Sequence, residues 1–262
     1  MTEPTSDPAA GAAAAVGVRS GLGAAAIAEG ERVARRSRIR EVVFGAQDGL
    51  LSTLALVTGV RGAETARETI LVAGLAGALA GTISMALGAY VAGKSQRDVF
   101  LAELDAEQAQ LRRRPHVEVF ELAEILEHEG LEWEQARRAA EAISTNERVM
   151  LKTMAEKELG IPFDPPGSPR GEGIVMGGSF FLGAAVPVLP YFFLSPATGL
   201  VVSLAVTLAV LFGIGVGKAR LTGQGWLRSG LEIAGLAAGA AVLAYAVGTL
   251  LPEHLGIHAP SG

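Results

Sequence analysis

The sequence predicts an all-α membrane protein with five transmembrane helices and a cytoplasmic helical insert between spans two and three. Half of the 262 residues are hydrophobic, and the mean hydropathy is +0.37. The 34 glycines suit membrane helices, because small residues let such helices pack closely. A net charge of −5 argues against nucleic acid as a partner. The absence of cysteine excludes disulfides, zinc–thiolate sites and thiol catalysis.

Five apolar stretches are each long enough to cross a lipid bilayer, which takes about 20 residues. In chain order they are 42–60, 70–93, 173–194, 198–217 and 230–251. A short turn at Ser195 and Pro196 should join the third and fourth spans as a tight hairpin. Pro187 and Pro190 should bend the third span.

The distribution of Lys and Arg predicts the orientation of these spans. Basic residues precede span one, follow span two and fill the connection between spans four and five: Arg32, Arg35, Arg36, Arg38, Arg40, Lys94, Arg97, Lys218, Arg220 and Arg228. With five crossings these three places fall on one side of the membrane. We therefore expect a cytoplasmic N-terminus and a C-terminus outside.

Composition divides the chain into five parts. They are a disordered N-terminal tail (1–35), spans one and two (36–93), a charged helical insert (94–170), spans three to five (171–252) and a C-terminal tail (253–262). Span two should continue into the insert, because no helix breaker occurs before Pro115. Three further helices should follow, with Gly130 and Gly160 as helix ends and Thr145 or Asn146 as a cap.

Two polar features interrupt the first two spans. Span one carries a carboxylate, Asp48, and span two carries the thioether of Met85. A lone acid within a membrane costs at least ~2.5 kcal/mol, so it is a functional-site hypothesis by default. An acid combined with a soft sulfur ligand indicates a transition metal. Metal binding and proton release should compete at Asp48, which makes it the candidate for proton coupling.

The insert offers further ligand types at helical spacing. Its pairs lie three or four residues apart and share a helix face: Glu107 with Gln110, Glu118 with Glu121, and Met154 with Glu158. Carboxylates on facing helices form metal sites in helical bundles. The alternative is a solvated acidic face with surface ion pairs such as Glu134–Arg138.

Three motifs carry a resemblance to a known family. REVVFGAQDGLLST (40–53), AGTISMALGAY (80–90) and GAAVPVLP (183–190) resemble segments of the vacuolar iron transporter family, which includes the nodulin-21-like proteins. The resemblance covers about residues 36–252. The Ala-Gly-Arg bias of the chain indicates a bacterial-type member in the plasma membrane, exporting outward.

The resemblance implies a transporter rather than an enzyme. It implies a homodimer in the lipid bilayer with the ion path at the subunit interface, and Fe2+ or Mn2+ moved out of the cytosol in exchange for protons. No prosthetic group is implied. Asp48 and Met85 match the family's ligands within the membrane. The matching positions in the insert are Glu107, Gln110, Glu118, Glu121, Met154 and Glu158.

Departures from the family pattern change what we expect of the proton coupling and of metal binding by the insert. The family's usual Glu within span two is Ala89 here, so Asp48 should bear more of the proton coupling. Gln110 replaces an acid and Ala155 replaces a second Met, so the insert should bind metal more weakly. Three alternatives remain open: a non-transporting metal sensor or scaffold, a membrane ferroxidase using the insert, and a passive channel. The ferroxidase is disfavoured because a di-iron site requires paired Glu-x-x-His motifs, which the insert lacks.

Overall fold

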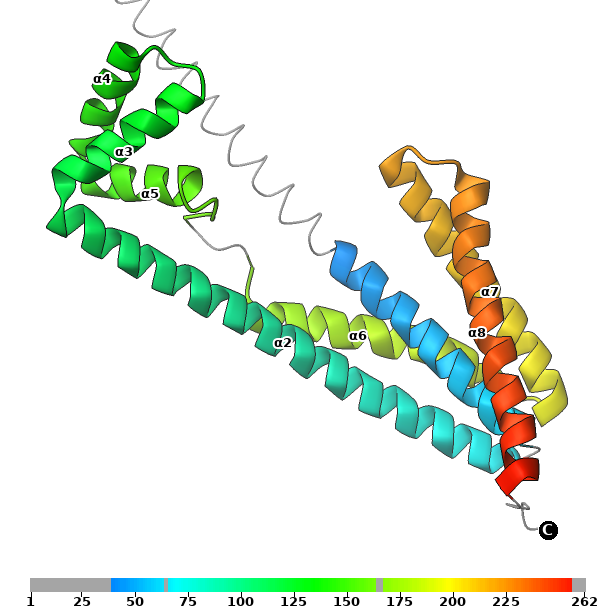
Figure 1. The fold of residues 1–262 in the computed structure, drawn as a ribbon. Helices are drawn as coiled ribbons and strands as arrows, with labels where there is room; N and C mark the ends of the chain where they lie inside the picture. Colours follow the sequence, from blue (N-terminus) through cyan, green and yellow to red (C-terminus); the bar gives the residue numbers. More distant parts are fainter. Residues whose placement is uncertain (1–38, 64–65, 164–166, 256–262) are drawn as a thin grey trace, which may run out of the picture. The chain divides into compact units, whose positions relative to one another are not determined.

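The computed structural model describes residues 39–63, 66–163 and 167–255, and these are helical almost throughout (Figure 1). Five of the helices are long and apolar enough to cross a membrane, which confirms the predicted fold class. The N-terminal tail and most of the C-terminal tail lie outside the described residues. The helices are, in chain order, helix 1 (Ile39–Gly62), α2 (Arg67–Arg113), α3 (Pro115–His128), α4 (Trp133–Ser144), α5 (Glu147–Lys157), α6 (Pro169–Val188), η1 (Leu189–Phe192), α7 (Pro196–Thr222) and α8 (Trp226–Leu255).

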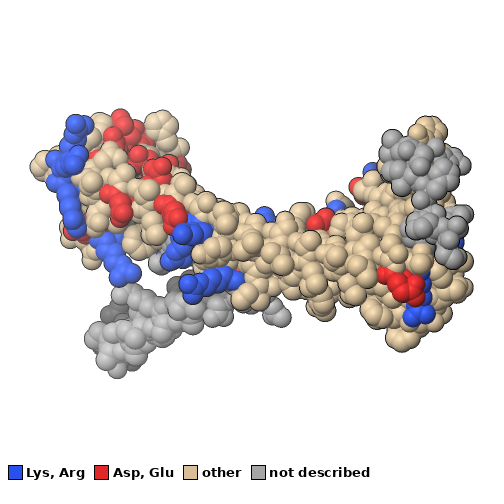
Figure 2. All heavy atoms as spheres, turned by 90° about the horizontal axis from the view of Figure 1, so that it is seen from below, with Lys and Arg blue, Asp and Glu red and all other residues tan. Residues whose placement is uncertain are grey.

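Contacts divide the chain into two compact units. We call the residues up to Leu87 together with those from Gly173 onward the span unit, and Gly88–Glu172 the insert unit. Charged side chains gather over the insert unit at the left of Figure 2, whereas uncharged surface covers most of the spans in that view. α2 belongs to both units because, as predicted, no residue breaks the helix until Pro115.

Glycines let the helices of the span unit touch at the backbone. A Cβ on Gly49 would overlap the carbonyl oxygen of Phe180, and a Cβ on Gly183 would overlap that of Ala46. Helix 1 and α6 therefore cross with almost no side chains between them, as small residues permit in membrane bundles. Gly248 of α8 approaches the Gly59 carbonyl of helix 1 in the same way.

These contacts also show the directions of the helices. Along helix 1, Gly45 meets Met176 and Gly49 meets Phe180, so helix 1 and α6 run parallel. Gly59 meets Ala244 and Gly62 meets Tyr245, so α8 runs the same way. α2 runs opposite to α6, because Gly81 faces Phe180 while the later Ala86 faces Gly177.

The third span, which was expected to bend at its prolines, changes from an α-helix to a 3₁₀ turn there. α6 contains Pro187 and gives way to the 3₁₀ turn η1 at Leu189, one residue before Pro190. The Ser203 hydroxyl of α7 donates a 2.8 Å hydrogen bond to the Pro187 carbonyl in a buried position. A neighbouring helix thus satisfies a backbone group at the change of helix, the condition under which membrane helices tolerate proline.

A separate apolar core holds the helices of the insert together. It is formed by Leu111, Leu122, Ala123, Leu126, Ala136, Ala140, Met150, Leu151 and Met154. Asn146 is the N-cap of α5, and its side chain accepts hydrogen bonds from the backbone N–H groups of Arg148 and Val149. Gly130 and Gly160 both have positive φ, at 108° and 65°, just after α3 and α5.

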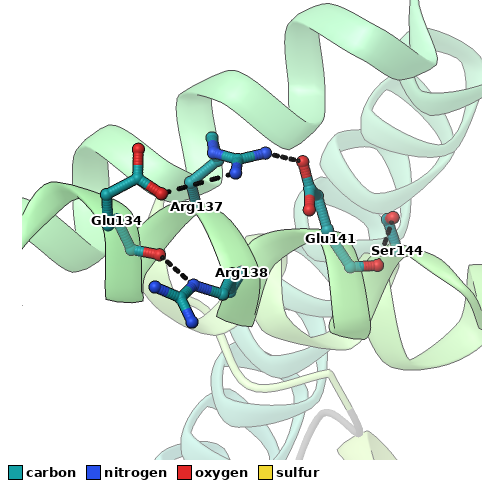
Figure 3. Close-up of polar contacts among 5 residues, drawn as sticks. All are labelled: Glu134, Arg137, Arg138, Glu141 and Ser144. Atoms are coloured by element: carbon teal, nitrogen blue, oxygen red, sulfur yellow. Dashed lines mark hydrogen bonds and ion pairs between the residues drawn. The ribbon is translucent and has the colours of Figure 1, made fainter.

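The surface pair expected between Glu134 and Arg138 is wrong in detail. Arg138 donates to the backbone carbonyl of Glu134, whereas Arg137 forms ion pairs with the carboxylates of Glu134 and Glu141 (Figure 3). Residues three and four apart both lie within reach on a helix, so spacing alone does not select the partner.

Replacing Ser203 with Ala should destabilise the protein, because the buried Pro187 carbonyl loses its donor. We expect a loss of about 0.5–1.7 kcal/mol in the free energy of unfolding, the range of hydrogen bonds between membrane helices. Unfolding by SDS in mixed micelles measures it. Thr207→Val is the matched control: Thr207 is equally buried on α7, but its hydroxyl has no hydrogen-bond partner in the part of the chain that the structure describes, so stability should hold or rise. Equal losses for both variants would contradict this account.

Gly183→Ala should impair folding strongly, because the new methyl group overlaps the Ala46 backbone and neither helix can yield without moving the crossing. Gly239→Ala is the control, since nothing lies within 4 Å of a Cβ built there. Detergent-solubilised yield and thermal midpoint compare the two. A Gly183→Ala protein as stable as Gly239→Ala would show that the crossing is less tight than described.

Candidate metal centre

Three glutamates from three helices converge in the insert unit. Glu107 lies near the end of α2, Glu118 in the first turn of α3, and Glu158 at the C-cap of α5. One carboxylate oxygen of each lies within 4.8 Å of the other two. Glu107 and Glu118 are only 1% and 2% exposed, whereas Glu158 is exposed and opens the cluster to solvent.

Local structure explains how this cluster forms. α2 ends at Arg113 and α3 begins at Pro115, so the chain turns at Arg114 and brings Glu118 close to Glu107. Proline suits the first position of α3, because its missing N–H would be unpaired there. The apolar core beneath, including Leu122 and Met154, fixes α5 against α3 and so positions Glu158.

The carboxylates hold protons more tightly than ordinary glutamates. Burial, followed by the charges of Glu158 and Glu118, raises the pKa of Glu107 to about 7. Burial and the charge of Glu121 raise the pKa of Glu118 and of Glu158. The Oε1 atom of Glu107 is buried and has no hydrogen-bond partner among the described residues. The cluster therefore takes up protons or a cation, because three negative charges, two of them buried, repel one another strongly at this distance.

The other residues predicted in the insert occupy different surroundings. Glu121 lies next to Glu118 and, with Glu158, lines a surface pocket of about 450 Å³ that also includes His128. Gln110 is exposed on α2, and Met154 is fully buried in the apolar core. The sequence did not indicate His128 as a neighbour of these acids, although its place in the same helix as Glu121 was a usable signal.

A second polar site lies in the span unit. Asp48 of helix 1 and Met85 of α2, both half-buried, line one pocket of about 250 Å³. The remaining lining residues are Ser52, Thr53, Leu56, Gly77, Gly81, Ser84 and Phe180. Gly81 lets the Phe180 ring form one wall, because a Cβ there would overlap that ring.

The pocket offers oxygen and sulfur ligands together. Ser52 follows Asp48 by four residues, so the helix brings it to the same face, a signal that the sequence interpretation did not use. Thr53 also lines the pocket. Ser52 donates a 2.6 Å hydrogen bond to the Asp48 backbone carbonyl. Thr82, by contrast, donates to the Ala78 carbonyl of its own helix and does not line the pocket. A carboxylate with a thioether and hydroxyls suits a divalent first-row metal ion.

The fold and these two sites define a multi-pass helical membrane protein with metal-ligand groups both in its spans and in its insert. A family model described as the VIT family matches residues 39–249. The chain belongs to this family, the vacuolar iron transporters.

Individual relatives agree with the family match. Vacuolar iron transporter 1 of Tulipa gesneriana is 36% identical over 210 residues, covering 80% of this chain and 85% of the relative. Its namesake in Arabidopsis thaliana is 35% identical over 208 residues, covering 79% and 83%. The vacuolar iron transporter of Toxoplasma gondii is 30% identical over 229 residues, covering 83% and 76%. These names are those of transporters, in agreement with the expectation that the chain is not an enzyme.

Lowering the pH below about 7 should weaken metal binding to the insert, because Glu107 must release its proton before it can coordinate. The apparent Kd for Mn2+ should rise by about tenfold per pH unit where one proton is displaced. Calorimetric titration of the purified full chain between pH 5.5 and 7.5 measures it. Glu107→Gln should bind at least about tenfold more weakly at pH 7.5, since lost contacts of charged groups cost about 1.5–3 kcal/mol. Glu124→Gln, an exposed neighbour on α3, should bind like the unmodified protein. A Kd independent of pH would contradict the site.

Without metal, the insert should become less stable as the pH rises. The pKa of Glu107 lies above its ordinary value of 4.5 in the folded state, so its contribution is complete below pH 4.5 and lost as the pH rises through about 7. The expected loss is roughly 3 kcal/mol. Hydrogen exchange of α3 and α5 in the chelated full chain, corrected for intrinsic rates, measures it. Glu107→Gln should flatten the profile, and an unchanged slope would assign it to other groups.

Proposed function

We propose that this protein carries Fe2+ out of the cytosol, with Mn2+ as a second cargo of the same chemistry. The observation that carries the proposal is the shared pocket of Asp48 and Met85, which places a carboxylate and a thioether from two different spans beside each other. Membership of the VIT family and the names of its relatives support iron as the cargo.

The insert collects the ion before transport. Its carboxylates are hard oxygen ligands that suit Fe2+ and Mn2+, and the exposed Glu158 gives access to the buried Glu107 and Glu118. Glu121 widens the acidic approach. Gln110 and Met154, which match family ligand positions, are proposed as supplementary ligands that engage when the metal is bound.

A homodimer completes the membrane site. One copy of the pocket offers one carboxylate and one thioether with neighbouring hydroxyls, fewer strong ligands than the roughly six positions of an octahedral first-row ion. Two copies facing each other across a symmetry axis double the set. Both Asp48 and Met85 remain partly exposed in the single chain, as groups at such an interface must be.

Proton exchange drives the release of the ion. Asp48 binds either the metal or a proton, so protonation from an acidic outer compartment displaces the ion there. Position 89 of α2, where the family pattern has a Glu, is Ala in this chain, so Asp48 carries the proton. No nucleotide-binding loop occurs in the sequence, which agrees with a gradient-driven carrier.

The helix directions support a cytoplasmic N-terminus and an outer C-terminus. Helix 1 and α8 run parallel, so Arg40 at the start of helix 1 and Arg228 at the start of α8 lie at the same end of the span unit. This is the end expected to face the cytosol. The relatives reported above come from plants and an apicomplexan and are named vacuolar, so export into an internal compartment agrees with them. The assignment to a bacterial plasma membrane rests on the amino-acid composition alone, and these relatives do not support it.

Asp48→Asn should reduce Fe2+ transport at least about tenfold, because a charged ligand and proton carrier is lost. Uptake into proteoliposomes with an imposed pH gradient measures it, and Met85→Leu should weaken transport while preserving side-chain volume. Thr82→Ala is the matched control, since Thr82 is bonded to its own helix. Asp48→Asn transport at the unmodified rate would rule out the carrier mechanism. Metal binding without flux in the unmodified protein would favour the sensor, and flux insensitive to pH would favour a channel.

A further inference from the structure

Two arginines converge on one short turn at the end of the span unit where helix 1 ends and α2 begins. Arg67, the first residue of α2, donates from its guanidinium to the backbone carbonyl of Phe192 in η1. Arg61, in the last turn of helix 1, interacts electrostatically with the hydroxyl of Tyr191 in the same turn. Residues from three segments thus bring two cationic groups to η1.

The phenol at the centre of this group is held in place. Tyr191 is fully buried, and its ring packs in a cluster with Val57, Ile70 and Val188. Gly199 of α7 lies against the ring, where a Cβ would come within 2.8 Å of Tyr191 Cδ1. The ring cannot swing away, so the position of its hydroxyl is set by packing.

Three polar atoms of this group lack an acceptor among the described residues. They are Nε of Arg61, Nε of Arg67 and the hydroxyl of Tyr191, and all three are buried. Guanidinium nitrogens only donate hydrogen bonds, and a hydroxyl can donate as well. Buried donors without a partner are unfavourable, so the arrangement calls for a group that is rich in acceptor atoms.

The charge of the site selects an anion. Glu68, the acid in the first turn of α2, is exposed and forms no ion pair with either arginine among the described residues. Glu64, which lies between the two arginines in the sequence, is outside the described residues. The N-terminus of α2 adds partial positive charge at the same place. Planar guanidinium groups bind oxyanions through paired N–H donors, and phosphate oxygens match that geometry.

We propose that Arg61, Arg67 and Tyr191 form a binding site for a phosphate-class oxyanion. The site is separate from the metal sites: Arg61 lies about 20 Å along helix 1 from Asp48, at ~1.5 Å per residue, and its donors repel cations. It therefore does not depend on the proposed transport. The phosphate is either a free ion or the headgroup of an acidic lipid, because the site lies at the end of the spans.

Thermal unfolding of the full chain in a neutral detergent tests the proposal, followed by the fluorescence of its two tryptophans. Sodium phosphate at pH 7.5 is compared with sodium chloride at equal ionic strength. Phosphate should raise the midpoint of the unmodified protein by at least about 3 °C when it saturates the site. A second arm replaces free phosphate with dioleoyl phosphatidic acid, with phosphatidylcholine as its control. A larger shift with phosphatidic acid identifies the lipid as the source, and a larger shift with free phosphate identifies the ion.

Variants connect the shift to the three residues. Arg61→Gln and Arg67→Gln should lose the phosphate-dependent shift whatever their own midpoint, because the readout is a difference within each variant. Tyr191→Phe keeps the packing of the ring and should reduce the shift by removing one donor. Arg220→Gln, an exposed arginine of α7, should shift like the unmodified protein. The proposal is overturned if the unmodified protein shows no shift with either phosphate source, or if the Arg61→Gln and Arg67→Gln variants shift as much as the unmodified protein.

Discussion

Repulsion among three neighbouring carboxylates is the constraint around which the insert is built. The apolar core between α3, α4 and α5 holds Glu107, Glu118 and Glu158 within 4.8 Å of one another. Packing supplies the free energy that keeps these groups together, and protons or a cation must remove the excess charge. Because the pKa of Glu107 is raised to about 7, the choice between proton and metal falls in the physiological range. The insert is therefore suited to bind and release a divalent ion rather than to hold it permanently.

Close packing of a different kind shapes the span unit. Helix 1 and α6 cross at glycines, and Gly81 allows the Phe180 ring to form a wall of the pocket that contains Asp48 and Met85. The glycine content of the chain thus has a functional consequence, because bulkier residues would separate the helices that form the pocket. The same packing leaves room for hydroxyl groups from Ser52 and Ser84 beside the carboxylate.

The metal sites and the arginine group differ in the sign of the ion that they suit. The insert and the Asp48 pocket present acceptor atoms, which suit cations. The group formed by Arg61, Arg67 and Tyr191 presents donors, which suit anions. The insert and the arginine group each leave buried polar atoms without a partner among the described residues: Glu107 Oε1 in the insert, and Nε of Arg61, Nε of Arg67 and the Tyr191 hydroxyl in the arginine group. Buried polar groups without partners are uncommon in folded proteins, so both places are informative about function.

The sequence by itself determined the local and repetitive features of this protein. Five apolar stretches predicted the five spans, the absence of a breaker before Pro115 predicted the long α2, and Asn146 was one of two predicted caps of α5. The motifs around Asp48 and Met85 identified the family correctly. These features depend on residues that are close together in the sequence, so the sequence is sufficient to predict them. Only the tertiary structure decided which acids converge: Glu107, Glu118 and Glu158 come from three helices, while the equally spaced Gln110 remains on the surface. The buried position of Tyr191 was decided in the same way. Such contacts join residues far apart in the chain, and their geometry follows from how whole helices pack.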